Sequence, residues 1–189
     1  MIGFLVGIVA SNAVEWAVHK YVLHGVGKKK SSYWSFHWNE HHRASRKHGF
    51  YDADYTRSPF GDHAQGKEVH GLLAISMGVV PLVRVAPSFC AGIWVSTAAY
   101  YAVHRKSHLD PAWARKYLPW HYDHHMAPDQ DKNWCVTFPL FDYLLGTREK
   151  YVGTAREQHD LQRVAARRQA RAAARQQQTQ KPAPVPQPA

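Results

Sequence analysis

The sequence predicts an all-α fold in which one N-terminal helix and a helical hairpin anchor a histidine-rich helical cap to a membrane. The first observation is an apolar segment at the start of the chain, residues 2–23. The second is a further apolar region, residues 71–103, which prolines and an arginine divide into two halves. The third is a series of histidines three or four residues apart, a spacing that puts side chains on one helical face.

The first apolar segment is long enough for a membrane helix. It is apolar as far as Ala13 and amphipathic afterwards. As a single helix it would be about 33 Å long, enough to cross the hydrocarbon core of a bilayer. Gly25 and Gly27 follow, and glycine is typical of a helix end.

The second apolar region predicts a helical hairpin. Pro81, Arg84 and Pro87 interrupt it and leave halves of about thirteen and sixteen residues, each short for a full membrane crossing. We therefore expect the region to dip into the membrane and to turn near Arg84. The alternative is a soluble protein in which these segments are buried core helices.

The order of the helices places the histidines at one end. The first helix delivers His19 and His24 at its C-terminal end, and the returning half of a hairpin brings His104 and His108 to the same side. Basic residues gather on that side too: Lys20, Lys28, Lys29, Lys30, Arg43, Arg46, Lys47, Arg105, Lys106, Arg115 and Lys116. The positive-inside tendency then predicts a membrane protein with its site on the cytoplasmic side.

Composition divides the chain into three parts. Residues 1–150 form the membrane-bound domain that carries the histidine clusters. Residues 151–180 read as a basic helical extension, and residues 181–189 as a Pro-rich disordered tail. The extension could attract anionic lipid or nucleic acid, but charge runs are usually solvated, so we expect it to be dispensable and expect no nucleic-acid partner.

Ten of the fourteen histidines fall into four clusters: His19 and His24; His37, His41 and His42; His104 and His108; His121, His124 and His125. Neutral imidazole is the commonest metal ligand in proteins. Helical spacing predicts a shared face within the last two clusters and for His37 with His41. His19 and His24, five residues apart, diverge by about 140° on an ideal helix, so we expect one of them on a fraying last turn.

The number of histidines predicts two metal ions. A structural zinc site closes with four ligands, whereas ten imidazoles give five to each of two ions and leave room for an oxygen ligand. Imidazole suits iron, zinc, copper and nickel, so ligand type alone does not identify the metal. Because imidazole is neutral, the ions would keep their positive charge and stabilise a reduced oxygen species able to attack a C–H bond.

The four clusters, in order and spacing, resemble the membrane fatty acid hydroxylase/sterol desaturase superfamily, a di-iron histidine-box family that includes carotenoid hydroxylases. Its motifs HX3–4H, HX2–3HH, HX3H and HX2–3HH match the four clusters in turn. The stretches around residues 19–25 and 133–147 are similar as well, and the resemblance spans Val14 to Thr147.

The resemblance implies an O2-dependent di-iron oxidoreductase that hydroxylates or desaturates a C–H bond of a fatty acyl lipid, sterol or carotenoid. The ten clustered histidines would bind two iron ions, with zinc as an alternative occupant. Family members take electrons from a fused cytochrome b5 domain or a separate donor, and no such domain fits here, so a ferredoxin or cytochrome b5 type partner is expected. The chain is short for the family's usual four membrane helices, and a homodimer could complete the lipid cavity.

Other interpretations of the same residues remain open. His37-Trp38-Asn39-Glu40-His41 matches the H-x-x-E-H motif of a zinc-dependent metallohydrolase. Metal storage is a non-enzymatic alternative. Glu15, Glu40 and Asp123 lie beside histidines in the sequence and are either partners that orient imidazoles or surface charges. The remaining histidines are interpreted as ordinary surface or hydrogen-bonded residues: His48, His63, His70 and His159.

Overall fold

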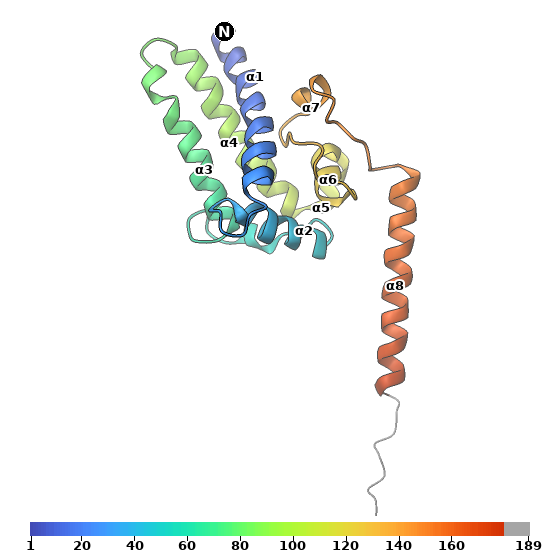
Figure 1. Ribbon diagram of the computed structural model, residues 1–189. Helices are drawn as coiled ribbons and strands as arrows, with labels where there is room; N and C mark the ends of the chain where they lie inside the picture. The colour runs from blue at the N-terminus through green and yellow to red at the C-terminus, as the bar shows by residue number, and fades with distance from the viewer. Residues whose placement is uncertain (180–189) are drawn as a thin grey trace, which may run out of the picture. The chain divides into compact units, whose positions relative to one another are not determined.

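The computed structural model describes residues 1–179, which form helices, turns and loops with no strand among them (Figure 1). The predicted Pro-rich tail, residues 181–189, lies outside the described residues. The helices are α1 (Ile2–Ala17), η1 (Val18–Val26), η2 (His37–His42), α2 (Arg43–Lys47), η3 (Ala53–Thr56), α3 (Ala64–Gly78), η4 (Val80–Leu82), α4 (Pro87–Leu109), α5 (Pro111–Tyr117), α6 (Pro119–Met126), α7 (Leu140–Leu144) and α8 (Ala155–Thr179). The chain divides into two compact units, Met1–Val152 and the part from Gly153 onward.

The N-terminal helix runs without interruption from Ile2 to Val26, because η1 continues α1. Within the described residues it is the one helix long and apolar enough to cross a membrane by length and composition. Its exposed side chains include Leu5, Val6 and Val9, as expected if this surface faces an apolar medium. The predicted apolar N-terminal helix is therefore present.

Helices α3 and α4 form the predicted hairpin and lie side by side (Figure 1). The turn between them carries η4, and Pro87 occupies the first turn of α4, where its missing N–H is tolerated. Both helices extend beyond the apolar region into polar sequence. His63 caps α3 by accepting a hydrogen bond from the Gly66 amide, and α4 ends where the Asp110 side chain caps α5.

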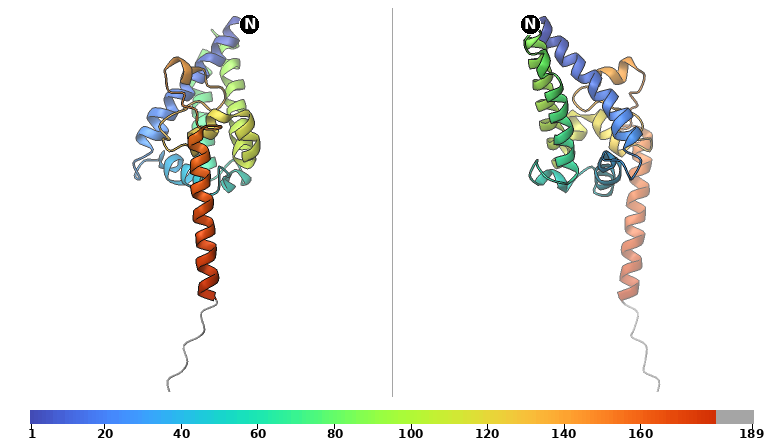
Figure 2. Two further views of the ribbon diagram at one scale, coloured as in Figure 1. Left: turned by 90° about the vertical axis from the view of Figure 1, so that its right-hand side faces the viewer. Right: turned by 60° about the vertical axis from the view of Figure 1, so that its left-hand side comes forward.

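Two glycines let α1 and α4 approach closely. A Cβ atom at Gly7 would lie 2.3 Å from the Phe89 carbonyl oxygen, and one at Gly92 would lie 2.3 Å from that of Phe4. The helices cross near these glycines and diverge toward the C-terminal end of α1 (Figure 2). This crossing holds the N-terminal half of α1 against α4, whereas the C-terminal end of α1 is farther from the hairpin.

The segment that follows α6 ties α1 to the rest of the first unit. Asp142 on α7 accepts hydrogen bonds from the Trp134 and Cys135 amides, each at 2.8 Å. Glu15 accepts hydrogen bonds from the amide of Thr137, at 2.9 Å, and from its hydroxyl, at 2.7 Å. These contacts hold residues 134–137 against the lower half of α1, beside the histidines.

The second unit contains α8, whose bounds agree closely with the basic helix expected from the sequence. Its first turn is held by a hydrogen bond from the Gly153 amide to Glu157, at 2.8 Å, and by an Arg156–Asp160 ion pair at 3.0 Å. Four arginines follow at four-residue intervals along the helix, and this spacing puts them on one face: Arg163, Arg167, Arg171 and Arg175.

Candidate metal centre

The ten clustered histidines come together in two adjoining groups. Their members come from η1, η2, α4 and α6, and each of the ten is buried. The first histidine group is His19, His24, His37, His42 and His124, and the second is His41, His104, His108 and His125; in each, the ligand nitrogens lie within 4.8 Å of one another. His121 adjoins the second group, with its Nε2 atom 3.1 Å from that of His108. Either group could hold a metal ion.

Two π-helices decide which histidines meet. In a π-helix the hydrogen bonds span five residues, as between the Gly27 amide and the Val22 carbonyl at 2.8 Å, so side chains five apart nearly align. His19 and His24 therefore face each other across 5.1 Å between ring centroids. The expectation that they diverge, with one on a fraying turn, is wrong because it assumed α-helical geometry.

The same geometry divides the second cluster. On η2, His37 and His42 lie five apart and their Nε2 atoms are 3.1 Å from each other in the first group. His41 points to the second group, 4.4 Å from His108 between ring centroids. His37 and His41, which the sequence predicted on a shared helical face, therefore belong to different groups. The third histidine motif, by contrast, is α-helical, and His104 and His108 stay in one group as expected.

The last cluster also supplies both groups, although α6 is an ordinary α-helix. His124 belongs to the first group, whereas His121 and His125 lie with the second. Consecutive residues point about 100° apart on a helix, so α6 places its adjacent His124 and His125 on different sides. The rings of His42 and His125 lie 4.2 Å apart between centroids, and the two groups meet there.

Distances between ligand nitrogens in the first group fit a metal ion with more than four ligands. The Nε2 atoms of His19 and His37 are 3.0 Å apart, and those of His24 and His124 are each 3.1 Å from that of His42. Ligands about 2.1 Å from an ion are about 3.0 Å apart at right angles and about 3.4 Å apart in a tetrahedron. The observed spacing matches the right-angled arrangement.

Burial keeps these imidazoles in the neutral form that binds metals. Burial, reinforced by repulsion from neighbouring histidines, holds the pKa values of His37 and His42 well below the usual range, and the same holds for His121 and His125. Burial also lowers the pKa of His124 to about 3. A neutral ring offers one nitrogen lone pair to an ion and one N–H group to another partner.

Several ring nitrogens of the second group lack a protein partner. The Nε2 atoms of His41 and His104 and both ring nitrogens of His125 have no hydrogen-bond partner in the described part of the chain. A buried polar atom without a partner costs about 1–3 kcal/mol, so such atoms normally bind something. An ion among these nitrogens would satisfy them, and the donor set therefore fits a metal.

The outer nitrogens of the first group bind mainly to one loop, residues 131–134. His19 Nδ1 donates to the Trp134 carbonyl and His124 Nδ1 to that of Lys132, each at 2.6 Å. His24 Nδ1 lies 3.1 Å from Asp131, whose side chain is half exposed and also pairs with Lys28. These bonds fix the ring orientations and leave the Nε2 atoms facing inward.

Two outer nitrogens of the second group bind carboxylates, one buried and one 10% exposed. His41 Nδ1 donates to Asp52 and His104 Nδ1 to Glu68, each at 2.8 Å. His108 Nδ1 donates to the Phe50 carbonyl at 2.9 Å. Phe50 has a φ of 81°, a backbone conformation that is strained for residues other than glycine. Strain at this position is consistent with a carbonyl aimed at a ligand.

The carboxylates expected from the sequence have other partners. Glu15 binds Thr137, and Asp123 pairs with Arg148 at 2.8 Å and accepts from the Val152 amide at 2.7 Å. Glu40 is half exposed and lies 3.8 Å from Lys67. None of the three carboxylates contacts an imidazole in the described residues. Three carboxylates that do bind clustered imidazoles were missed from the sequence, because they lie 11, 36 and 107 residues from their histidine partners: Asp52, Glu68 and Asp131.

The H-x-x-E-H motif does not assemble as a single-ion site. Its two histidines belong to different groups, and the Glu40 carboxylate is in solvent. The four remaining histidines lie outside both groups. His63 caps α3, His70 lies 3.1 Å from the Tyr33 hydroxyl, and His48 and His159 are exposed.

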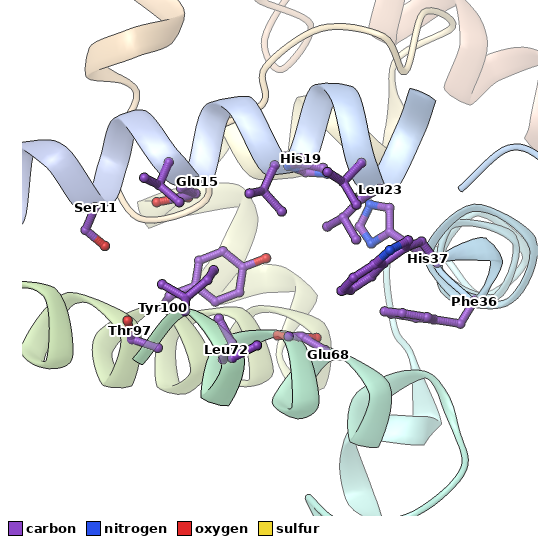
Figure 3. A pocket seen from close by; sticks show the side chains of 17 residues that line it. Ser11, Glu15, His19, Leu23, Phe36, His37, Glu68, Leu72, Thr97 and Tyr100 are labelled. Carbon is purple, nitrogen blue, oxygen red and sulfur yellow. The ribbon is translucent and has the colours of Figure 1, made fainter. Parts of the chain in front are cut away.

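A cavity of about 330 Å³ adjoins the first group (Figure 3). It runs along the lower half of α1, between this helix and the α3–α4 hairpin, and His19 and His37 form one end. Its walls are mostly apolar: Ser11, Val14, Glu15, Val18, His19, Val22, Leu23, Trp34, Phe36, His37, Glu68, Gly71, Leu72, Ala74, Ile75, Thr97 and Tyr100. The apolar pattern could not locate this cavity, because apolar residues at helical spacing look the same whether they line a cavity or fill a core.

Comparison with known protein families, curated proteins and solved structures finds no match to this chain. The interpretation of the site therefore depends on its own residues and geometry.

Proposed function

We propose that this protein is an O2-dependent di-iron membrane oxidoreductase that hydroxylates or desaturates a C–H bond of a lipid. The observation that carries the proposal is a group of five imidazoles at the end of an apolar cavity, beside a group of four imidazoles that His121 adjoins. A fatty acyl lipid, a sterol or a carotenoid would supply an apolar chain or ring for that cavity. The motif resemblance to the fatty acid hydroxylase/sterol desaturase superfamily supports the same conclusion.

Iron is the proposed metal in both groups. Five nitrogens at near right-angled spacing leave one further position for oxygen, whereas structural zinc closes with four tetrahedral ligands. Zinc remains an alternative occupant because it also binds imidazole. When bound, the two irons would supply the electrons and the oxygen activation that oxidation of an unactivated C–H bond requires.

The protein's own residues would orient the ligands and the lipid. The carbonyls of Lys132 and Trp134 and the carboxylates of Asp52 and Glu68 accept the Nδ1–H bonds, so each of these rings presents Nε2 inward. The apolar walls of the cavity would hold the lipid and keep water from the first group. Because a single chain forms this cavity, the proposal requires no homodimer.

The membrane arrangement is part of the proposal. Ile2–Val26 would span the bilayer, and the hairpin would dip into it beside this helix. The basic residues at the histidine end support a cytoplasmic location for that end by the positive-inside tendency. A ferredoxin or cytochrome b5 type donor would reach the metal centre from this side, where positive charge favours an acidic partner.

Lipid analysis of cells tests the proposal. Cells that express the protein should accumulate a lipid that is one oxygen atom heavier or two hydrogen atoms lighter than its precursor, and purified protein should contain two irons per chain. His125→Ala should abolish the product, because both ring nitrogens of His125 lack another partner. His48→Ala changes an exposed histidine and is the matched control. An unchanged lipid profile with a fully iron-loaded protein would contradict the proposal.

A further inference from the structure

A second apolar groove lies on the hairpin, separate from the metal centre. Its volume is about 310 Å³, and Phe60, Val69, Leu73, Trp94 and Ala98 contribute to its walls. No acidic or basic side chain lines it, whereas the inner cavity includes Glu15 and Glu68. A groove of this composition suits a hydrocarbon chain and offers nothing to pair with a charged ligand.

The groove and the inner cavity share two wall residues. Leu72 of α3 and Thr97 of α4 line both spaces, and Figure 3 shows them on the inner-cavity wall opposite α1. Residues that line both spaces lie between them, and we call Leu72 and Thr97 the partition. The two spaces therefore meet at these two residues, whose side chains can change rotamer on a fast timescale.

Hydrogen bonds join α3 and α4 on either side of this partition. Trp94 Nε1 donates to the Ser76 carbonyl at 3.0 Å toward the hairpin turn, and Gln65 donates to the Tyr101 hydroxyl at 2.8 Å toward the histidine end. The Thr97 hydroxyl bonds within its own helix, to the Ile93 carbonyl at 2.9 Å. At the level of the partition the two helices are thus held together by side-chain packing, and Leu72 can move without breaking a hydrogen bond.

The surroundings of the groove identify its occupant as hydrocarbon. Phe60 and Met77 are each 65% exposed and Leu73 is 50% exposed, which in water would be an unfavourable apolar surface. Beside a bilayer the same surface would contact lipid chains. Because Leu72 and Thr97 line both spaces, we expect the groove and the cavity to bind the same kind of molecule.

We propose that the groove on the hairpin binds an alkyl chain of a membrane lipid and admits it between Leu72 and Thr97 into the cavity at the first histidine group. This inference rests on the proposed function for the role of the cavity as the substrate site. It adds the route by which the lipid reaches that site, laterally from the bilayer through the α3–α4 hairpin.

Photolabelling of the full-length protein in lipid bilayers tests the route. The probe is a phosphatidylcholine with a diazirine in one acyl chain, and adducts are mapped by mass spectrometry. Wild-type protein should carry adducts in the groove, at Phe60 or Leu73, and in the inner cavity, at Phe36, which is buried. Absence of groove adducts, or cross-links there to a second copy of the chain, would overturn the proposal.

Two tryptophan substitutions on α4 provide a matched pair. Ala98→Trp would fill the groove from outside without lining the inner cavity, and should lower the initial rate of inner labelling at least fivefold. Ala102→Trp, one turn along on the same exposed side, lines neither space and should leave that rate unchanged. Equal inner labelling in the two variants would overturn the lateral route.

A third variant opens the partition and remains informative if Ala98→Trp does not fold. Leu72→Ala should raise the initial rate of inner labelling about twofold or more, and an unchanged rate would count against the proposal. The outcomes also separate this inference from the proposed function. Normal product formation by Ala98→Trp overturns the route alone, whereas labelling as expected without any oxidised lipid overturns the function and supports the route.

Discussion

The second histidine group, together with the adjoining His121, offers as many imidazoles as the first, but the two differ in what surrounds them. The outer nitrogens of the first group bind backbone carbonyls and the half-exposed Asp131, and two of its rings line the apolar cavity. Those of the second group bind the carboxylates of Asp52, which is buried, and of Glu68, whose side chain is 10% exposed. Negative charge beside an imidazole strengthens it as a ligand. We infer that the second group binds its ion more tightly and that the first is closer to the substrate.

Removal of one ligand from each group is the strongest test of this comparison. His24→Ala and His104→Ala should each lower the metal content from two ions per chain toward one, since each residue belongs to one group only. His24→Ala should leave the tighter ion, which a chelator removes more slowly. Metal analysis before and after chelation measures both effects, with His48→Ala as the control. Loss of both ions from either variant would show that the groups do not bind independently.

Acid should destabilise the metal-free protein through both groups. The pKa of His124 is about 3 in the folded chain and about 6.5 when unfolded, so below pH 6.5 the unfolded state binds more protons. The free energy of unfolding should then fall by about 1.4 kcal/mol per pH unit for this imidazole, down to about pH 3. Unfolding in detergent between pH 7 and 5 measures the slope, and bound metal should shift the loss to lower pH. If the metal-free protein were equally stable at pH 7 and pH 5, this would contradict the burial of the imidazoles in their neutral form.

Substitution of the outer carboxylates compares the two groups directly. Burial raises the pKa of Asp52, but its hydrogen bond and charge interaction with His41 lower it more, so the carboxylate is ionised beside the ring. Asp52→Asn should weaken metal binding by the second group about 10- to 100-fold. Asp131→Asn should have a smaller effect, because Asp131 is half exposed. Metal titration of both variants measures this difference. Equal effects would contradict the inference that the second group binds its ion more tightly than the first.

Removal of the second unit should have the smallest effect. The chain should be truncated after Val152, because Tyr151 is buried and the Val152 amide donates a hydrogen bond to Asp123 at 2.7 Å. Metal content and lipid oxidation should be unchanged, and stability should change by less than about 0.5 kcal/mol. Activity measured in cells and metal analysis check this expectation. A loss of either ion would show that the unit from Gly153 onward supports the metal centre.

Much of the fold could be predicted from short-range patterns. The apolar N-terminal helix, the hairpin with its turn near Arg84 and the basic helix α8 all follow from composition and from glycine and proline positions. The α-helical pair His104 and His108 was predicted to share a face and does so. The pairing on η1 and η2 was not predictable, because a π-helix has no clear sequence signature and tertiary contacts stabilise it.

The sequence alone determined that ten imidazoles are available, that they come in four motifs, and that apolar helices carry two of them to one end of the fold. These properties are local, since they depend on side-chain chemistry and on spacing along one helix. Tertiary structure decided how the imidazoles divide between two groups, which carboxylates hold them and where the apolar cavity lies. Those features depend on contacts between residues as distant in sequence as His19 and Trp134, and the relative positions of such residues are set by packing of the whole first unit.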